Sequence, residues 1–352
     1  MPARILDRDD LYVLNFCAKH LARANLDPRH AYDVDTPSEI ARISEAWRFP
    51  IIDGFFDAES GTLSGAANRA TFVFVARDSL PARVGVVGTF SDLYDPLPLG
   101  RIPDTPYFAL TALVPRGEVH TYKLIVDGQA LLDPINPQRT TLDNGETWSR
   151  FFTEACTTPL VLESWEWRIL ERLTRHILPF RTEEAENFLA RFYEGLDRGS
   201  RAARYRAAYR FDESVGVVNF IDKLLAREEM HHRIDYAICL ELIDRVMRTK
   251  NPFVEPYQMT VEEYVELYEQ LGRGQVPHWD YGRYNNPRYF LKLLRRHSLT
   301  GAFSHPKYGG NAGAAAWAWL SERYRDETTG ETLFEWMRAL EAPLGTSPAY
   351  RG

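Results

Sequence analysis

The chain has 352 residues, of which 45% are hydrophobic and 26% charged, a composition typical of soluble proteins with two or three domains. Its formal net charge of −7, without a basic stripe, argues against nonspecific nucleic-acid binding. The cysteines Cys17, Cys156 and Cys239 are scattered without a CxxC pair, which predicts free thiols rather than a zinc or iron–sulfur site.

The first residues, MPARILDRDDLYVLNF, show neither a charged-then-apolar leader nor a twin arginine. No apolar run approaches the roughly 18 residues that a membrane span needs. We therefore expect a cytoplasmic protein without a signal peptide or membrane span. Export in the company of a partner chain is the alternative.

Residues 1–65 are predicted to be a helical N-terminal region. Helical spacing relates four early apolar residues, Leu11, Leu14, Ala18 and Leu21. Thr36, Pro37 and Glu39 form a capping-box pattern that predicts the start of a second helix. The small and polar residues of 57–70 are typical of a linker.

The periodicity changes at residue 71, where β-rich runs begin. These runs are TFVFVAR, ARVGVVGTF, YFALTALVP and HTYKLIVDG, with turn signals between them. Several short strands within about 85 residues favour a small β-sandwich over 71–154.

The run VGVVGTFSDLYDPLPL, followed by GEVHTYKLIVDGQALLDPINP, resembles the family-48 type of carbohydrate-binding module. The resemblance covers residues 71–154 and implies an immunoglobulin-like sandwich that binds α-glucan. Leu93 and Ala130 stand where that family has its sugar-stacking tryptophans, while Lys123 is retained. Tyr94 and Trp148 are candidate replacements, because aromatic plates bind the apolar faces of sugars. The alternative is that these aromatic residues belong to the core or to an interface.

Residues 160–345 are predicted to form an all-α domain. Four apolar residues of its first helix share one face, namely Trp165, Ile169, Leu173 and Ile177. Thr260 with Glu263 predicts a capped helix that ends at Gly272, and Asn286 with Pro287 predicts another that reaches Gly301. A last helix is expected to contain Leu333, Phe334, Met337 and Leu340.

The stretch RRHSLTGAFSHPKYGGNAGAAAWAWL resembles the C-terminal signature of the gluconate 2-dehydrogenase subunit 3 family. The matching residues are His297, Gly301, Phe303, Pro306, Tyr308, Gly309, Gly310, Asn311 and Trp317. His305 replaces the usual acid, and Ala316 replaces a glycine. Upstream, ILERLTRHILPF and VGVVNFIDKLLA also resemble helices of that family, so the likeness spans about 160–325.

The resemblance implies a non-catalytic small subunit that binds and stabilises a large flavoprotein of the glucose-methanol-choline oxidoreductase type. The partner would hold FAD and oxidise a sugar, sugar acid or glycoside, while this chain would bind no cofactor itself. The candidate partner-docking residues are His297, His305, Tyr308, Gly309, Gly310, Asn311 and Trp317.

The residues of the motif are themselves consistent with a rigid docking turn. Gly309 and Gly310 permit positive φ angles, and Asn311 can cap the following helix, from which Trp317 would project. The alternative is that the motif only ends one helix and begins the next inside the domain. The two interpretations are compatible, because a rigid turn can also present a surface.

No catalytic constellation is apparent, so we expect no enzyme activity from this chain alone. It lacks GxGxxG, a P-loop and GxSxG. His231 and His232, with Glu228 and Asp235 nearby, make a metal site conceivable, but we expect a solvated helix face and no metal. His297 and His305 are expected to be ordinary hydrogen-bonded histidines rather than proton-transfer groups.

The sequence is therefore consistent with three functional hypotheses. The first is an accessory subunit of an FAD-dependent complex. The second is an adaptor that binds carbohydrate through the sandwich, and the third is a metal-dependent enzyme of the helical domain.

Overall fold

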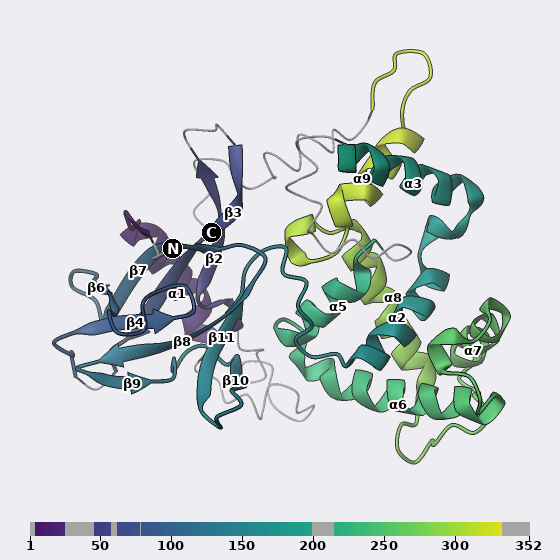
Figure 1. Ribbon diagram of the computed structural model, residues 1–352, viewed down its shortest axis with the longest axis horizontal. Helices are drawn as coiled ribbons and strands as arrows, with labels where there is room; N and C mark the ends of the chain where they lie inside the picture. The colour runs from purple at the N-terminus through teal and green to yellow at the C-terminus, as the bar shows by residue number, and fades with distance from the viewer. Residues whose placement is uncertain (1–3, 25–45, 58–61, 78, 199–214, 333–352) are drawn as a thin grey trace. The chain divides into compact units, whose positions relative to one another are not determined.

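The computed structural model describes residues 4–24, 46–57, 62–77, 79–198 and 215–332 (Figure 1). The chain divides into two compact units after Cys156, and each unit is described by itself. The capping pattern at Thr36–Glu39 and the helix expected over Leu333–Leu340 lie outside the described residues.

The first unit contains one α-helix and two antiparallel sheets among its described residues. Its elements are β1 (Ile5–Leu6), α1 (Asp10–Ala24), β2 (Ile51–Asp57), β3 (Thr62–Val75), β4 (Val84–Gly88), β5 (Leu97–Pro98), β6 (Gly100–Arg101), β7 (Tyr107–Pro115), β8 (Val119–Val126), β9 (Gln129–Leu131), β10 (Arg139–Thr141) and β11 (Thr147–Phe152). One sheet has the order β1-β7-β3-β2, with β6 also paired to β7. The other has the order β10-β11-β8-β4-β5, with β9 paired to β8.

The two sheets share one aromatic core. Phe72 of β3 stacks on Phe90 at 5.0 Å and meets Tyr122 of β8 and Phe151 of β11 edge-on at 5.3 and 5.7 Å. All four rings belong to one buried cluster. The strands predicted within 71–128 are thus confirmed, and they pack as two layers. The immunoglobulin-like class of this sandwich stays a prediction.

The first 65 residues are not purely helical, so that prediction is wrong. Strands β1 and β2 and the start of β3 lie there, and the expected linker at 57–70 is instead largely part of the 14-residue strand β3. Its small polar residues are accommodated because β3 pairs with β2 on one side and β7 on the other. Buried Asn68, for example, donates to Asp53 O and accepts from Glu154 N.

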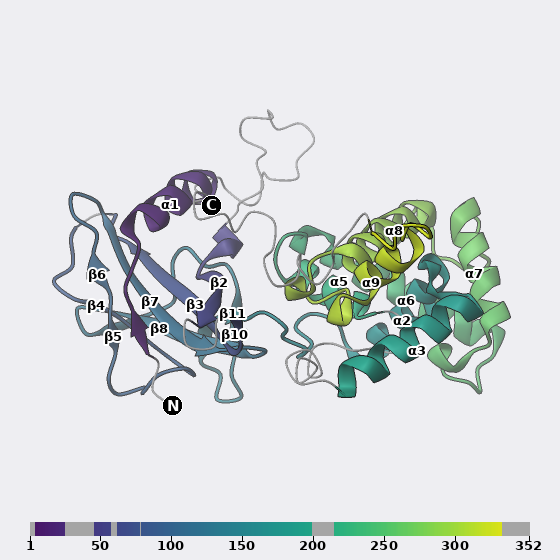
Figure 2. The ribbon, with the colours of Figure 1, turned by 90° about the horizontal axis from the view of Figure 1, so that it is seen from above.

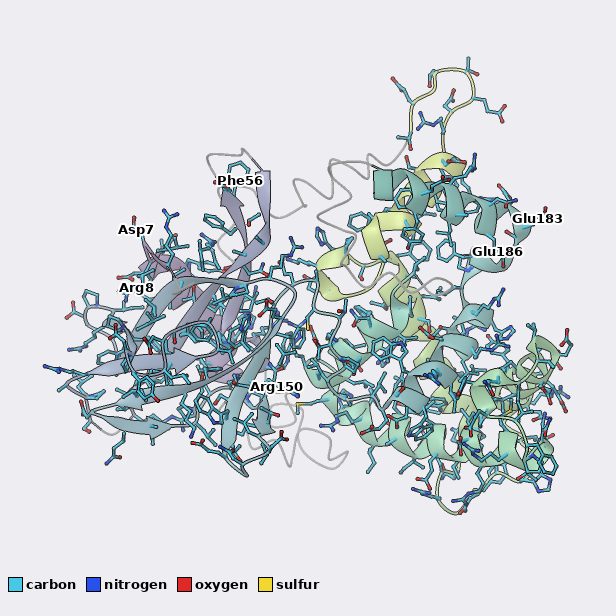
Figure 3. All side chains as sticks on the ribbon, viewed as in Figure 1. Asp7, Arg8, Phe56, Arg150, Glu183 and Glu186 are labelled. Carbon is cyan, nitrogen blue, oxygen red and sulfur yellow. The ribbon has the colours of Figure 1, made fainter. Side chains whose placement is uncertain are left out.

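Helix α1 covers the outer face of the first sheet, above β2, β3 and β7 (Figure 2). Its buried side chains include Val13, Cys17 and Leu21, whereas Leu11 is 62% exposed. The helix is confirmed, but the predicted face is rotated, because Leu11, Leu14 and Ala18 are not among the buried residues. The β2–β3 hairpin carries exposed Phe56 beyond a break in register at Gly54–Phe56 (Figure 3).

The described part of the second unit is helical. Its α-helices are α2 (Ser164–Ile177), α3 (Glu183–Arg198), α5 (Val217–Ala226), α6 (Arg233–Lys250), α7 (Val261–Arg273), α8 (Pro287–Phe303) and α9 (Ala315–Arg323). Short 3₁₀ turns include η4 (Met230–His232), η6 (Pro306–Tyr308) and η7 (Ala312–Ala314). Helix α8 is central, since it contacts α2, α5, α6, α7 and α9 (Figure 1).

The capping predictions in this unit are confirmed. Thr260 accepts a hydrogen bond from Glu263 N while the Glu263 carboxylate accepts from Thr260 N. Asn286 likewise accepts from Tyr289 N at the start of α8. Helix α7 continues past Gly272 to Arg273 and is capped by Gly274, whose φ is 73°, because glycine readily adopts the left-handed conformation that terminates a helix.

Two details of the helix predictions change. Trp165 is 37% exposed, so the buried face of α2 is formed by Trp167, Ile169, Leu170 and Leu173 instead. Helix α8 passes through Gly301 to Phe303. In the part of the chain that the structure describes, no helix combines the length and apolar character that crossing a membrane requires.

Candidate functional site

The motif after α8 forms a tightly wound turn. Gly309 has a φ of 98°, as predicted, and Asn311, Gly313 and Ala314 also have positive φ, at 47°, 65° and 64°. Gly310 does not. Its side-chain hydrogen is needed for another reason: a Cβ there would lie 2.2 Å from the carbonyl oxygen of Gly301. The double glycine therefore supplies one reversal and one close backbone approach.

Asn311 joins the end of α8 to the start of α9. Its amide nitrogen donates to Ser304 O at 2.9 Å, and its amide oxygen accepts from Ala316 N at 2.9 Å. Asn311 therefore caps α9, as predicted, although Ala314 directly precedes that helix. Trp317 does not project freely, because its indole N–H donates to Phe303 O at 2.9 Å.

Helix α5 holds this turn through a polar network that the sequence analysis did not identify. Asn219 donates to Gly309 O at 3.1 Å and accepts from the ammonium of Lys223 at 3.1 Å. Lys223 also donates to Asp222 at 2.9 Å and to Thr158 O at 2.7 Å. All three side chains of α5 are at least 98% buried.

Asp222 fixes the segment that leads into α2. Its two carboxylate oxygens accept the backbone N–H groups of Leu160, Val161 and Leu162 at 2.8–2.9 Å. The signal in the sequence is three polar residues at positions i, i+3 and i+4 of an otherwise apolar helix, VVNFIDKLLA. Such residues share one face, and here that face is inside the unit.

The candidate docking residues differ in their access to solvent. His297, Gly309, Gly310 and Asn311 are buried, so a docking role for them would be indirect, through the shape of the turn. His305 and Trp317 are half-buried, with their rings edge-on at 5.7 Å.

Tyr308 is the candidate docking residue with the largest exposure. Its side chain is 42% exposed, and the ammonium of Lys307 lies 5.1 Å from its ring. Direct docking through Tyr308 stays a prediction.

His297 and His305 both have hydrogen-bonding neighbours. The Nδ1 of His297 lies 2.9 Å from the Tyr236 hydroxyl, and the two rings are parallel. Burial lowers the pKa of His297. The Nδ1 of His305 accepts from Lys307 N at 3.1 Å. Both imidazoles are thus hydrogen-bonded, and the absence of a proton-transfer role stays a prediction.

The adjacent histidines lie in a cluster rather than on a solvated helix face, which corrects that prediction. His231 and His232 belong to the 3₁₀ turn η4, their ring centroids are 3.9 Å apart, and His232 is 9% exposed. Donor atoms of Glu229, His231 and His232 all lie within 4.8 Å of one another. The carboxylate beside the two histidines is therefore Glu229, not Glu228.

Arg296 and His297 of α8 complete this cluster. The nearest carboxylate oxygen of Glu229 lies 2.6 Å from Arg296 Nη2, 3.4 Å from His232 Nε2 and 3.5 Å from His297 Nε2. The His297 imidazole and the charge of Arg296 lower the pKa of Glu229 to about 2. The Glu229 carboxylate is thus ionised at neutral pH.

In the first unit, two of the three candidate sugar-binding residues meet on the outer face of the second sheet. The ammonium of Lys123 on β8 lies 4.8 Å from the ring of Trp148 on β11 and pairs with the Glu146 carboxylate. Tyr94 is 96% exposed in the loop between β4 and β5. The structure thus brings Lys123 and Trp148 together, and sugar binding there stays a prediction.

Comparison with known proteins supports the resemblance of the helical unit. Residues 165–321 match the family model of gluconate 2-dehydrogenase subunit 3, and this range includes the 297–317 motif, helix α5 and the histidine cluster. No curated protein matches the chain.

Solved structures of two esterases show a limited likeness. The enterochelin esterase from Shigella flexneri is 19% identical, with a TM-score of 0.23 over 26% of this chain and 31% of that one. The ferric enterobactin esterase from Salmonella typhimurium is 18% identical, with a TM-score of 0.24 over 31% and 36%. The chain thus spans about a third of their length, and a likeness of this extent assigns it no esterase activity.

Proposed function

We propose that this chain is a non-catalytic accessory subunit of a dehydrogenase complex. Its catalytic partner would be an FAD-dependent oxidoreductase of the glucose-methanol-choline type that acts on a sugar, sugar acid or glycoside. The match of residues 165–321 to the gluconate 2-dehydrogenase subunit 3 model carries this proposal. In it, FAD belongs to the partner and this chain supplies a binding surface.

The turn around Tyr308 is the proposed centre of that surface. Gly309 follows directly and is held by Asn219, so the backbone that carries Tyr308 is anchored to buried α5. Tyrosine is enriched among residues that dominate binding energy, and an anchor that is already ordered loses less conformational entropy on binding. The buried motif residues would thus act by holding Tyr308 in place.

Native-level purification of the tagged chain from its host tests this proposal. We expect a larger chain to co-purify and the eluate to show a flavin absorption spectrum. A colourless, solitary protein would contradict the proposal. Fractionation of the same cells tests the proposed cytoplasmic location against export with the partner.

Tyr308→Ala is the matching variant for the docking surface. Loss of a dominant contact costs at least about 2 kcal/mol, or roughly 30-fold in affinity. Tyr324→Ala removes another tyrosine of the same unit that is 62% exposed, and it should leave co-purification unchanged. Equal retention of the partner by both variants would place the docking surface elsewhere.

The second candidate function is a carbohydrate-binding adaptor, favoured by the Lys123–Trp148 pair. The half-buried indole of Trp148 supplies an apolar plate, and the ammonium of Lys123 can donate to sugar hydroxyls. Retention on an α-glucan column that is lost with Lys123→Ala and with Trp148→Ala would support this function. If neither substitution reduces retention, the sugar site lies away from this pair. Tyr94→Ala would then test whether the exposed loop between β4 and β5 binds the sugar.

A further inference from the structure

The cluster around Glu229 has the donor atoms and spacing of a metal centre. In a tetrahedral site with ligand bonds of 2.0–2.1 Å, neighbouring donors lie about 3.3 Å apart. The Nε2 atoms of His232 and His231 lie 3.4 and 3.9 Å from the same oxygen of Glu229. All three donors lie within 4.8 Å of one another, so side-chain adjustments of up to about 1.5 Å would bring them to bonding distance.

The outer contacts of His232 favour metal binding independently of that spacing. Its Nδ1 lies 2.7 Å from Asp235 Oδ2, and the other oxygen of Asp235 accepts from the Tyr284 hydroxyl at 2.9 Å. An ionised carboxylate only accepts hydrogen bonds, so Nδ1 carries a proton, which leaves Nε2 as the nitrogen of His232 that can bind a metal ion. This carboxylate–histidine arrangement is the one that orients histidine ligands in metal sites.

Arg296 provides the positive charge near these donors. Its Nη2 lies 2.6 Å from Glu229 Oε2 and 3.0 Å from His297 Nε2. The Arg296 side chain is 54% exposed, so it can turn toward solvent without leaving a buried hole. A divalent cation would take over its charge-neutralising role and gain the imidazole nitrogens as ligands.

We propose that Glu229, His231 and His232 bind a divalent transition-metal ion of the zinc class, with Arg296 displaced. Imidazole and carboxylate donors suit Zn²⁺, Co²⁺ and Ni²⁺ better than Ca²⁺ or Mg²⁺. His297 Nε2, 3.5 Å from the same Glu229 oxygen, is the nearest further donor. Coordination by His297 in addition would join η4 to α8. The proposal is independent of the accessory-subunit function.

Titration with Co²⁺ tests the site. The full chain, prepared without a polyhistidine tag and stripped with a chelator, is titrated while visible absorption and stoichiometry are followed. We expect one ion per chain and the intense visible bands of tetrahedral cobalt. His232→Gln should weaken binding at least 100-fold, and Asp235→Asn, which alters only the outer contact, about 10- to 100-fold.

Two further variants keep the test decisive. Arg296→Gln should tighten binding, because it removes the competing cation, whereas a site built only as an ion pair would gain no metal affinity. His278→Asn alters an exposed histidine outside the cluster whose φ of 62° asparagine also tolerates, and it should change nothing. Absence of stoichiometric cobalt in both the unaltered chain and Arg296→Gln would overturn the proposal, as would binding that His232→Gln does not weaken.

Discussion

Replacing Gly310 with alanine should destabilise the helical unit more than its small size suggests. The added Cβ would lie 2.2 Å from the carbonyl oxygen of Gly301 and 2.8 Å from its carbonyl carbon. It must retreat by at least about 0.8 Å to reach 3.0 Å, the closest approach that real Cβ atoms make. Both partners are backbone, so no side chain can rotate away, and α8 must move relative to the turn.

The expected cost is at the upper end of the 1–3 kcal/mol typical of overpacking. For a unit of this size, about 3 kcal/mol lowers the melting temperature by roughly 6–12 °C. Gly301→Ala should cost less, because its Cβ meets the side chain of Phe220, at 2.7 Å, rather than backbone.

Differential scanning calorimetry of the full chain measures this effect. Gly195→Ala is the matched control: Gly195 lies within α3, and nothing lies within 4 Å of the position that an alanine methyl would take, so alanine there should stabilise by about 0.5–1 kcal/mol. A melting temperature for Gly310→Ala within 1–2 °C (roughly the shift of a 0.5 kcal/mol change) of the unaltered chain would refute the reasoning.

Three other predictions follow from buried groups. Asp222→Ala should lower the free energy of unfolding, measured by chemical denaturation, by about 3–5 kcal/mol, because it leaves the buried ammonium of Lys223 without its counter-charge. A decrease below about 1 kcal/mol would contradict this. Cys17, Cys156 and Cys239 are buried, and burial raises the pKa of Cys17 to about 12, so none should react with a thiol reagent in the native protein; rapid native labelling would be inconsistent with that burial. Burial lowers the pKa of His120 in the folded protein, so the unfolded chain binds a proton at this imidazole more readily than the folded one. The free energy of unfolding should therefore be unaffected above the unfolded-state pKa near 6.5 and should fall as the pH drops from there toward the lower folded-state pKa. An NMR titration of His120 with a midpoint at or above 6.5 would show that reasoning to be wrong.

Local signals in the sequence predicted local structure well. The pair Thr260 and Glu263 defined the start of α7, because a capping box is complete within four residues. The β-rich runs from residue 71 likewise predicted their strands, because alternation is a property of neighbours. The first helix was predicted, but its buried face was not, since Leu11 has the right chemistry and still points to solvent.

Features that depend on distant partners were not predictable from spacing. Asn68 appeared to belong to a polar linker, yet its amide is satisfied by residues of two other segments. The Glu229 cluster unites η4 with Arg296 and His297, more than 60 residues further along the chain. The spacing of the polar residues of α5 can be read from the sequence, but only the fold shows that this polar face is buried inside the unit.

The contacts of Asp222 also decide where the helical unit can be cut. Its three backbone donors lie at 160–162 and the Thr158 carbonyl holds Lys223, whereas the family match begins only at residue 165. A truncated chain starting at 165 would lose three charge-assisted hydrogen bonds, together worth up to roughly 5–9 kcal/mol, comparable to the whole net stability of a domain. A fragment meant to fold as the helical unit should therefore begin no later than Thr157, because the folded unit extends further toward the N-terminus than the residues that match the family.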